Sequence, residues 1–461
     1  MGSITEVSGE DTRRPSEMEG PGLLPSEESK PSDDRVVQTE LSNGLSVLVK
    51  EIHAAPVASF WIWYRVGSRN EHVGITGISH WVEHMLFKGT EAFPKGAAEK
   101  AIAREGGVFN GATSYDFTTF FGTLPSDRIE LSLRIEADRM VNAAFDPAEV
   151  EAERTVVISE RQGAEDSPEF LLGEELMGAA LRVHPYGSPT IGHLCDLRSI
   201  TRDQLYEHYR TYYVPANAVA VVAGDIDTDE IVELIGQCFG PIARGDPVPS
   251  VAAVEPQQRG ERRVVVRREG FVPYLKVAFG APSVREPDFF AMAVLNAILT
   301  GASAMTFRGG GLTNKSCRLY KALVAKELAV SVSGFLLPTI DPFPYGLSAV
   351  VRPGRSPAEV QEALEAELVT ITDGQVTPEE VDKAIKQAKA QFAYSSESVT
   401  DQALWLGFSE IFADHTWSDE YLDHLGAVTV EDVRRVAQQY LKRSNRTVGW
   451  YVPPDGEPAT G

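Results

Sequence analysis

The sequence predicts an α+β protein of two homologous α+β halves, each with an antiparallel-rich sheet and helices packed on one face. Three observations support this prediction. The chain has 461 residues, more than a single hydrophobic core usually serves. Segments of alternating or β-branched residues, typical of strands, lie between segments with helical periodicity. A helix–turn–strand segment also occurs twice, about half of the folded chain apart.

The repeated segment is the clearest sign of duplication. Residues 200–222 and 428–450 align without a gap at a shift of 228 residues. Both copies read as a helix with a threonine N-cap, an exposed turn and a terminal strand. Chance similarity is the alternative, but a duplicated unit explains the spacing more simply. The matching pairs are Thr201 with Thr429, Tyr212 with Tyr440, and Asn217 with Asn445.

The first half opens with two alternating segments around Asn43-Gly44, a sequence typical of a β-hairpin. Strands are expected at 36–41, 45–49 and 57–66, helices at 74–87 and 95–105, strand structure at 109–124, helices over 129–181, and a strand at 218–222. The second half is expected to open with strands at 263–268 and 274–279, followed by a helix at 289–299, a glycine loop and more helix.

Composition suggests where the domains begin and end. The first residues are rich in Glu, Ser, Pro and Gly and have too little apolar surface to order, so they predict a disordered acidic tail. A stretch rich in Pro, Gly and charge predicts a linker between the halves. The expected divisions are the tail at 1–34, a first domain at 35–240, the linker at 241–262, and a homologous second domain at 263–455.

The formal charge of −23 disfavours nucleic acid as a partner, because phosphates need compensating Lys and Arg. An acidic cavity would attract cationic peptides, although the charge serves solubility equally well. Cys195, Cys238 and Cys317 are far apart, which argues against both disulfides and a thiolate zinc site and predicts largely buried thiols in a reducing compartment. No apolar segment is long enough to span a membrane, and no secretory signal is evident, so a cytoplasmic location is expected.

Residues 80–84 read His-Trp-Val-Glu-His and predict a metal site. On a helix, His80 and His84 project from the same face, and two imidazoles one turn apart can bind one zinc ion. Glu83 lies beside His84, where it can reach a water on the metal rather than the metal itself. This HxxEH order is the inverse of the HExxH motif. The alternative is a pair of ordinary histidines on an amphipathic helix.

A catalytic zinc ion has three protein ligands and one open position, so a third ligand is needed. Asp146-Pro147 is typical of a helix start, and the helix that follows carries Glu153 and Glu160. These two residues are seven apart, hence two turns apart on one face. One could bind the metal while the other hydrogen-bonds a ligand. Spacing alone leaves open which does which.

Residues 80–90, together with Glu153-Arg154 and Glu160, resemble the pitrilysin (insulinase) family of zinc metallopeptidases. This family includes insulin-degrading enzyme and the mitochondrial processing peptidase. The resemblance extends over residues 36–452 and is to the two-domain bacterial members. In the family a glutamate about 76 residues after the second histidine binds the metal. The resemblance therefore implies Glu160 as the third ligand and Glu153 as the family's auxiliary catalytic glutamate.

The resemblance implies a zinc-dependent endopeptidase with one zinc ion per chain, in which Glu83 activates the attacking water. It makes residues 35–240 the metal-binding peptidase domain and residues 263–455 a homologous domain without a metal site. Residues Asn110, Gly111, Ala112 and Thr113 resemble the family's edge strand, which binds an extended peptide by β-augmentation. Two-domain members form dimers around a chamber, so this chain would be half of a clam-like enclosure.

The second half departs from the family pattern. A glycine loop at 309–311 is present and is followed by Arg318 and Tyr320. Further on, however, Leu323 and Val330 stand where the family has an Arg and a Tyr that polarise the substrate carbonyl. Such groups change rates by orders of magnitude. A heterodimer with a metal-free homologue that supplies the pair is one explanation. A weakly active or structural subunit of the family is another, and a hydrolase of a non-peptide substrate is a third reading.

Overall fold

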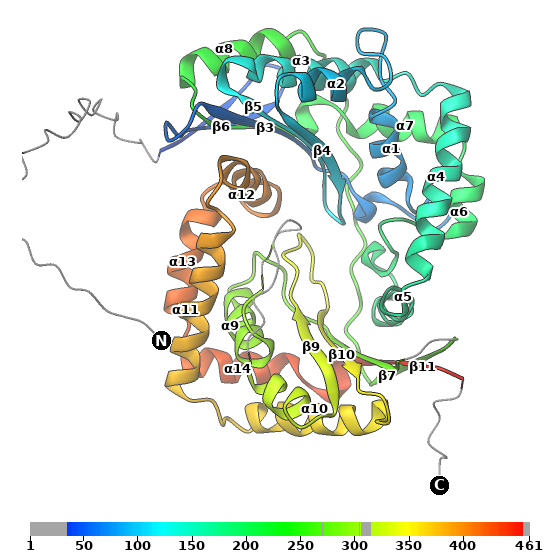
Figure 1. Cartoon of the computed structure of the whole chain (residues 1–461), viewed down its shortest axis with the longest axis vertical. Helices are drawn as coiled ribbons and strands as arrows, with labels where there is room; N and C mark the ends of the chain where they lie inside the picture. Colours follow the sequence, from blue (N-terminus) through cyan, green and yellow to red (C-terminus); the bar gives the residue numbers. More distant parts are fainter. Residues whose placement is uncertain (1–34, 269–271, 304, 306–314, 455–461) are drawn as a thin grey trace, which may run out of the picture.

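The computed structural model describes residues 35–268, 272–303, 305 and 315–454. The tail at 1–34 and the glycine loop at 309–311, both named from the sequence, lie outside these residues. The described chain forms two halves, each built of one sheet with helices against it (Figure 1). The prediction of a duplicated α+β fold is therefore confirmed, while the domain boundaries proposed from composition stay predictions.

The first half contains a six-stranded sheet with strand order β1-β2-β6-β3-β5-β4. Strands β2 and β6 run parallel, and the other neighbours are antiparallel. The strands are β1 (Val36–Glu40), β2 (Ser46–Glu51), β3 (Val57–Tyr64), β4 (Val108–Thr113), β5 (Thr118–Pro125) and β6 (Ala218–Gly224). The helices are α1 (Ile78–Leu86), α2 (Ala97–Arg104), α3 (Ile129–Asn142), α4 (Pro147–Glu165), α5 (Pro168–Ala180), α6 (Leu194–Ser199), α7 (Arg202–Tyr212) and α8 (Thr228–Phe239), with short 3-10 turns η1 (Ser68–Asn70), η2 (Ser126–Arg128), η3 (Pro185–Gly187) and η4 (Pro215–Asn217).

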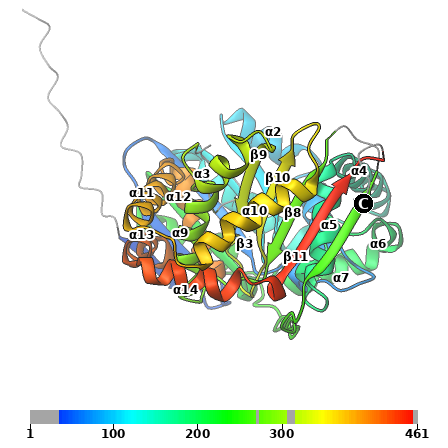
Figure 2. The ribbon, with the colours of Figure 1, turned by 90° about the horizontal axis from the view of Figure 1, so that it is seen from below.

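The second half contains a five-stranded sheet with strand order β7-β11-β8-β10-β9, in which β7 and β11 run parallel. Helix α10 covers its outer face (Figure 2). The strands are β7 (Arg262–Arg267), β8 (Tyr274–Phe279), β9 (Ala329–Phe335), β10 (Tyr345–Val351) and β11 (Arg446–Val452). The helices are α9 (Asp288–Thr300), α10 (Pro357–Thr372), α11 (Pro378–Tyr394), α12 (Val399–Phe412), α13 (Trp417–Ala427) and α14 (Val430–Tyr440), with a short π-helix η5 (Tyr320–Val324) and a 3-10 turn η6 (Arg443–Asn445).

The repeated segment has the same hydrogen bonds in both copies. A threonine side chain caps α7 and another caps α14, each within a capping box. Beyond each helix, an asparagine side chain donates to a tyrosine carbonyl: Asn217 to Tyr212 at 2.8 Å, and Asn445 to Tyr440 at 2.9 Å. The strand that follows, β6 or β11, lies between one parallel and one antiparallel neighbour. These shared contacts support the duplication inferred from the sequence.

Each half also places one helix against the sheet of the other half. Helix α12 packs on β3 and β6, and α5 packs on β7, β8 and β11 (Figure 1). Gly407 of α12 lies so close to Trp63 that an added Cβ would stand 2.0 Å from the indole nitrogen. A Cβ at Gly449 of β11 would stand 2.9 Å from Leu172 of α5. The halves therefore share their cores.

The sequence of β3 explains this sharing. Trp61 and Trp63 face the core that contains α12, whereas Phe60 and Ile62 face the core that contains α1 and α3. All four side chains are fully buried. An almost continuous apolar strand is typical of a sheet covered on both faces. Each half packs its own helices on one face of its sheet, as predicted. The second face of each sheet is covered by a helix of the other half: α12 covers the first sheet and α5 covers the second.

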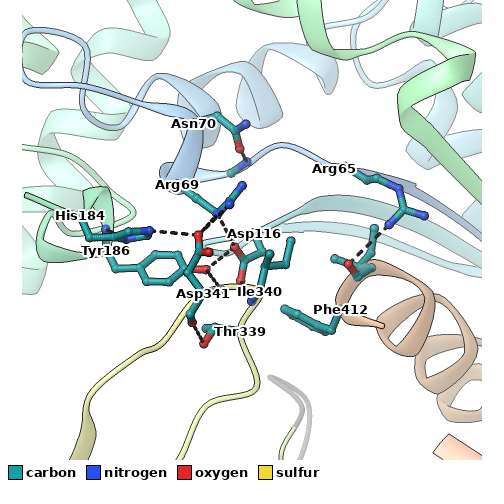
Figure 3. A network of polar contacts seen from close by, with 12 residues as sticks. Arg65, Arg69, Asn70, Asp116, His184, Tyr186, Thr339, Ile340, Asp341 and Phe412 are labelled. Carbon is teal, nitrogen blue, oxygen red and sulfur yellow. Dashed lines mark hydrogen bonds and ion pairs between the residues drawn. The ribbon is translucent and has the colours of Figure 1, made fainter. Parts of the chain in front are cut away.

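A polar network joins the two halves near the end of β4 (Figure 3). Arg69 Nε donates to Asp341 Oδ2 at 2.7 Å. The buried Asp116 carboxylate accepts hydrogen bonds from Tyr186 Oη at 2.5 Å and from the Ile340 amide at 3.2 Å. Burial raises the pKa of Asp116 to about 6. The network ties the turn after β4 to the second half.

The helix of the HxxEH motif is shorter at its start than predicted. The expected helix began at residue 74, whereas α1 begins at Ile78. Gly74 and Gly77 have φ angles of 104° and 86°, in the left-handed region that a right-handed helix cannot include. The segment before Ile78 therefore forms a turn.

Glu71 caps the start of α1 from outside the helix. Its carboxylate accepts hydrogen bonds from the backbone amides of Gly77 at 2.7 Å and Ser79 at 2.9 Å. Gly77 itself has no side chain to serve as a cap. Glu71 is buried, and burial raises its pKa to about 7. The helix that carries the motif thus begins at a buried carboxylate.

The three cysteine thiols differ in exposure. Cys317 is buried, but Cys238 is half-buried and Cys195 is exposed, so the expectation of largely buried thiols is wrong for Cys195. Cys195 follows the first residue of the short surface helix α6, where apolar packing does not enclose it.

None of the helices in the described ranges combines the length and apolar character that crossing a bilayer requires. The cytoplasmic location stays a prediction.

The pH dependence of stability should reveal Glu71. Its folded pKa of about 7 exceeds its ordinary value of 4.5, so the folded state binds this proton more tightly. The stability that protonated Glu71 contributes is fully present below pH 4.5 and is lost as the pH rises through about 7. Glu71→Gln removes this titration, and the variant should gain stability relative to the unmodified protein over that window in urea unfolding. The exposed Glu91→Gln is the control; parallel curves for both variants would contradict the assignment.

Candidate metal centre

Helices α1 and α4 pack against each other and bring three predicted ligands together. His80 Nε2 lies 3.9 Å from Glu160 Oε1, and His84 Nε2 lies 3.5 Å from Glu160 Oε2. One ligand atom from each of these residues lies within 4.8 Å of the other two. Within the described parts of the chain, this is the one group of three or more His, Cys, Asp or Glu residues with metal-binding geometry.

The donor set fits zinc. Zinc bonds to nitrogen and carboxylate oxygen are about 2.0–2.2 Å long, so tetrahedral ligand atoms lie roughly 3.3–3.6 Å apart. The 3.5 Å separation lies within this range, and the 3.9 Å separation is slightly longer. Burial, with His84 as a neighbour, lowers the pKa of His80 to about 4, which keeps its imidazole neutral and able to bind metal. The Glu160 side chain is 49% exposed, so this side of the cluster is open to solvent.

Glu83, the predicted general base, is buried beside the cluster. Burial raises its pKa, while a hydrogen bond from Thr113 Oγ1 to its Oε2, 2.7 Å long, opposes that shift. A carboxyl group in such surroundings is suited to take up and release a proton. Thr113, expected on the substrate strand, makes a contact with Glu83 that the sequence does not predict. No local spacing could reveal it, because the two residues lie on a helix and a strand 30 positions apart.

The predicted substrate strand is β4, which lies at one end of the first sheet. It pairs with β5 on one side, and no other described strand follows it in the sheet order. Asn110 is exposed, and Gly111, Ala112 and Thr113 are half-buried. An edge strand of this kind leaves backbone N–H and C=O groups for an added strand. Peptide binding at these four residues stays a prediction.

Glu153 lies on the other side of His84 from Glu160. Its Oε1 is 2.9 Å from His84 Nδ1, and its Oε2 contacts Lys88 Nζ. Burial would raise the pKa of Glu153, but the hydrogen bonds of Lys88 and His84 outweigh it and lower that pKa. Of the two acids that spacing left open, the geometry therefore pairs Glu160 with the Nε2 atoms and Glu153 with a ligand's far nitrogen. The contact of Lys88 with Glu153 is not predicted by the sequence.

The second half has no Arg and Tyr at the positions named from the family pattern. Leu323 in η5 is fully buried, and Val330 on β9 is 55% exposed. Arg318 does not take the place of the missing Arg, because its guanidinium donates to Glu367 at 3.2 Å and to Glu380 at 2.6 Å. This side chain holds the start of η5 against α10 and α11.

Two family models match the chain. Residues 46–193 match "Insulinase (Peptidase family M16)", and residues 199–388 match "Peptidase M16 inactive domain". A zinc protease named PqqE from Helicobacter pylori is 30% identical over 429 residues, which cover 90% of this chain and 92% of that protein. A probable mitochondrial-processing peptidase subunit beta from Arabidopsis thaliana is 26% identical over 87% of this chain and 76% of its own length.

Solved structures agree. The crystal structure of a protease from Helicobacter pylori has a TM-score of 0.85 at 27% identity and covers 91% of this chain and 99% of that one. An M16 inactive-domain structure from Pseudomonas fluorescens has a TM-score of 0.82 at 18% identity, covers 93% of this chain and 100% of that one, and supports the fold alone. Because the matches span both halves and nearly the whole length of the relatives, this chain belongs to the insulinase (M16) family of peptidases.

Proposed function

We propose that this chain is a zinc-dependent endopeptidase whose metal is bound by His80, His84 and Glu160. The observation that carries the proposal is the convergence of two imidazoles and one carboxylate from α1 and α4, with the buried Glu83 on the same helix. Relatives over nearly the whole length are named zinc proteases, which supports zinc as the metal.

The chemistry follows from the side chains. A bound zinc ion would polarise a peptide carbonyl and make water more acidic. Glu83 accepts the proton of the attacking water and later gives it to the leaving amine. Thr113 binds Oε2 of Glu83, so we assign Oε1 as the oxygen that takes the proton. Burial raises the pKa of Glu83, which suits a group that must both accept and donate.

The substrate would be an extended peptide that adds a strand to the free edge of β4. Backbone hydrogen bonds with Asn110, Gly111, Ala112 and Thr113 would hold it and impose little sequence preference. Thr113 lies at the last position of β4 and contacts Glu83, so a peptide along this edge would pass the general base.

The chain would act as the metal-bearing subunit of a dimer. Leu323 and Val330 stand where the family pattern has an Arg and a Tyr, so a metal-free homologue would supply this pair. The same observation favours a second candidate, a weakly active or non-catalytic subunit, because the chain by itself lacks both groups. The two differ in whether a partner restores peptide cleavage.

Glu83→Gln should abolish hydrolysis of a quenched peptide and leave zinc content unchanged. Loss of a general base costs about 10²–10⁴-fold in rate, whereas the three ligands stay intact. Elemental analysis and peptide cleavage measure the two quantities, with the exposed Glu91→Gln as control. Turnover close to that of the unmodified protein would overturn the mechanism.

His80→Ala should lose zinc, because two remaining protein ligands hold a zinc ion poorly. The matched control is His72→Ala, which removes an exposed histidine from the loop before the same helix. Zinc per chain, measured after dialysis, should fall close to zero in His80→Ala and stay near one in the control. Equal zinc content in both variants would show that the metal lies elsewhere.

Cleavage of a quenched peptide should be slow for the chain alone and rise by at least about tenfold with the co-purified partner, since carbonyl-polarising groups matter on this scale. A chelator should block both activities. Full activity without a partner would contradict the heterodimer. No activity in any combination, with zinc present, would favour the structural subunit.

A further inference from the structure

Lys88 lies two residues beyond the end of α1 and contacts the buried acid behind the candidate metal centre. Its ammonium group binds Glu153 Oε2, and its side chain is 20% exposed. We propose that Lys88 is a positioning residue: by holding Glu153, it keeps the His84 imidazole in the tautomer and orientation that present Nε2 to the metal. This inference rests on the proposed zinc site.

Glu153 is held in a fixed position by two partners. The side chain is 6% exposed, and each carboxylate oxygen has its own partner, His84 at Oε1 and Lys88 at Oε2. A buried carboxylate is costly unless it is paired and hydrogen-bonded. Without the Lys88 ammonium, Oε2 would lose its cation, and the carboxylate would be free to turn towards solvent.

The contact with Glu153 sets the tautomer of His84. An ionised carboxylate only accepts hydrogen bonds, so His84 Nδ1 must carry the proton that faces Glu153, and Nε2 keeps its lone pair. The opposite tautomer would place a proton on Nε2, which lies 3.5 Å from Glu160 Oε2. That proton would point at Glu160 and block metal binding through Nε2. Glu153, and through it Lys88, selects the tautomer that can bind.

The two histidines differ in this respect. His80 Nδ1 is buried and has no hydrogen-bond partner among the described residues. His84 thus has a tautomer-setting contact that His80 lacks, which makes the Lys88–Glu153 pair specific to one ligand.

A neighbouring ion pair provides a matched control. Lys95 Nζ lies 2.6 Å from Glu149 Oε2 and joins the same two regions of the chain, the segment after α1 and helix α4. This pair is on the surface, with the Lys95 side chain 57% exposed, and it does not contact a predicted ligand. Removing Lys95 should therefore alter charge and local stability without reaching His84.

The experiment compares Lys88→Met, Lys88→Arg and Lys95→Met in the full-length chain. Zinc dissociation constants from chelator competition should rise about 10–100-fold for Lys88→Met, as for other outer partners of metal ligands. Lys95→Met should stay within about twofold, and Lys88→Arg should recover most of the affinity. In zinc-free protein with ¹⁵N-labelled histidine, the His84 signals should show protonated Nδ1 in the unmodified protein and a mixture of tautomers in Lys88→Met.

The outcomes separate the two proposals. If the unmodified protein does not bind zinc, the proposed function fails. If it binds zinc and Lys88→Met has the same affinity and the same His84 signals, the zinc site stands and the positioning role is overturned. If Lys88→Met does not fold, Lys88→Gln is judged by the same criteria, because it removes the charge and keeps a hydrogen-bond donor.

Discussion

The candidate metal centre depends on the packing of α1 against α4, because each helix supplies only part of the set. His80 and His84 are one turn apart on α1, but Glu160 comes from a helix that begins more than sixty residues later. A small rotation of either helix would separate the carboxylate from the imidazoles. Packed interiors resist such rotation, since side chains on both helices interlock with their neighbours. The chemistry therefore rests on the rigidity of this contact.

Several buried polar contacts surround that packing and act in the same direction. Glu71 fixes where α1 begins, and Glu153 fixes one face of His84. Thr113 joins Glu83 to the edge strand. Each contact gives a carboxylate defined hydrogen-bond donors in a nearly dry environment, where hydrogen bonds are strong and unpaired groups are costly. The candidate site is thus held by carboxylates that are not among the three proposed ligands.

The second half supports the first although it supplies no metal ligand. Helix α12 covers the tryptophan face of β3, and the network around Asp116 ties the turn after β4 to residues Ile340 and Asp341. Because α12 and α5 each cover the sheet of the other half, one face of each sheet would be uncovered without the other half. For this reason the second half can lose the groups expected at Leu323 and Val330 and still be needed for the fold of the first.

Local patterns in the sequence determined the elements that carry the site. The HxxEH spacing placed two histidines on one helix face, and Asp146-Pro147 predicted the start of α4. The repeat predicted matching N-caps at Thr201 and Thr429. These features depend on residues within a turn or two of one another, so periodicity and capping rules reveal them.

Only the tertiary structure decided the contacts between distant segments. Spacing could not choose between Glu153 and Glu160, and it gave no sign of the pairing of Thr113 with Glu83 or of Lys88 with Glu153. The two glycines that shorten α1 were also visible in the sequence, but the contacts of their amides, Gly77 with Glu71 and Gly74 with Asp196, form only in the folded chain. Which side chains meet across helices depends on how the elements pack, and packing is a property of the whole chain rather than of any local pattern.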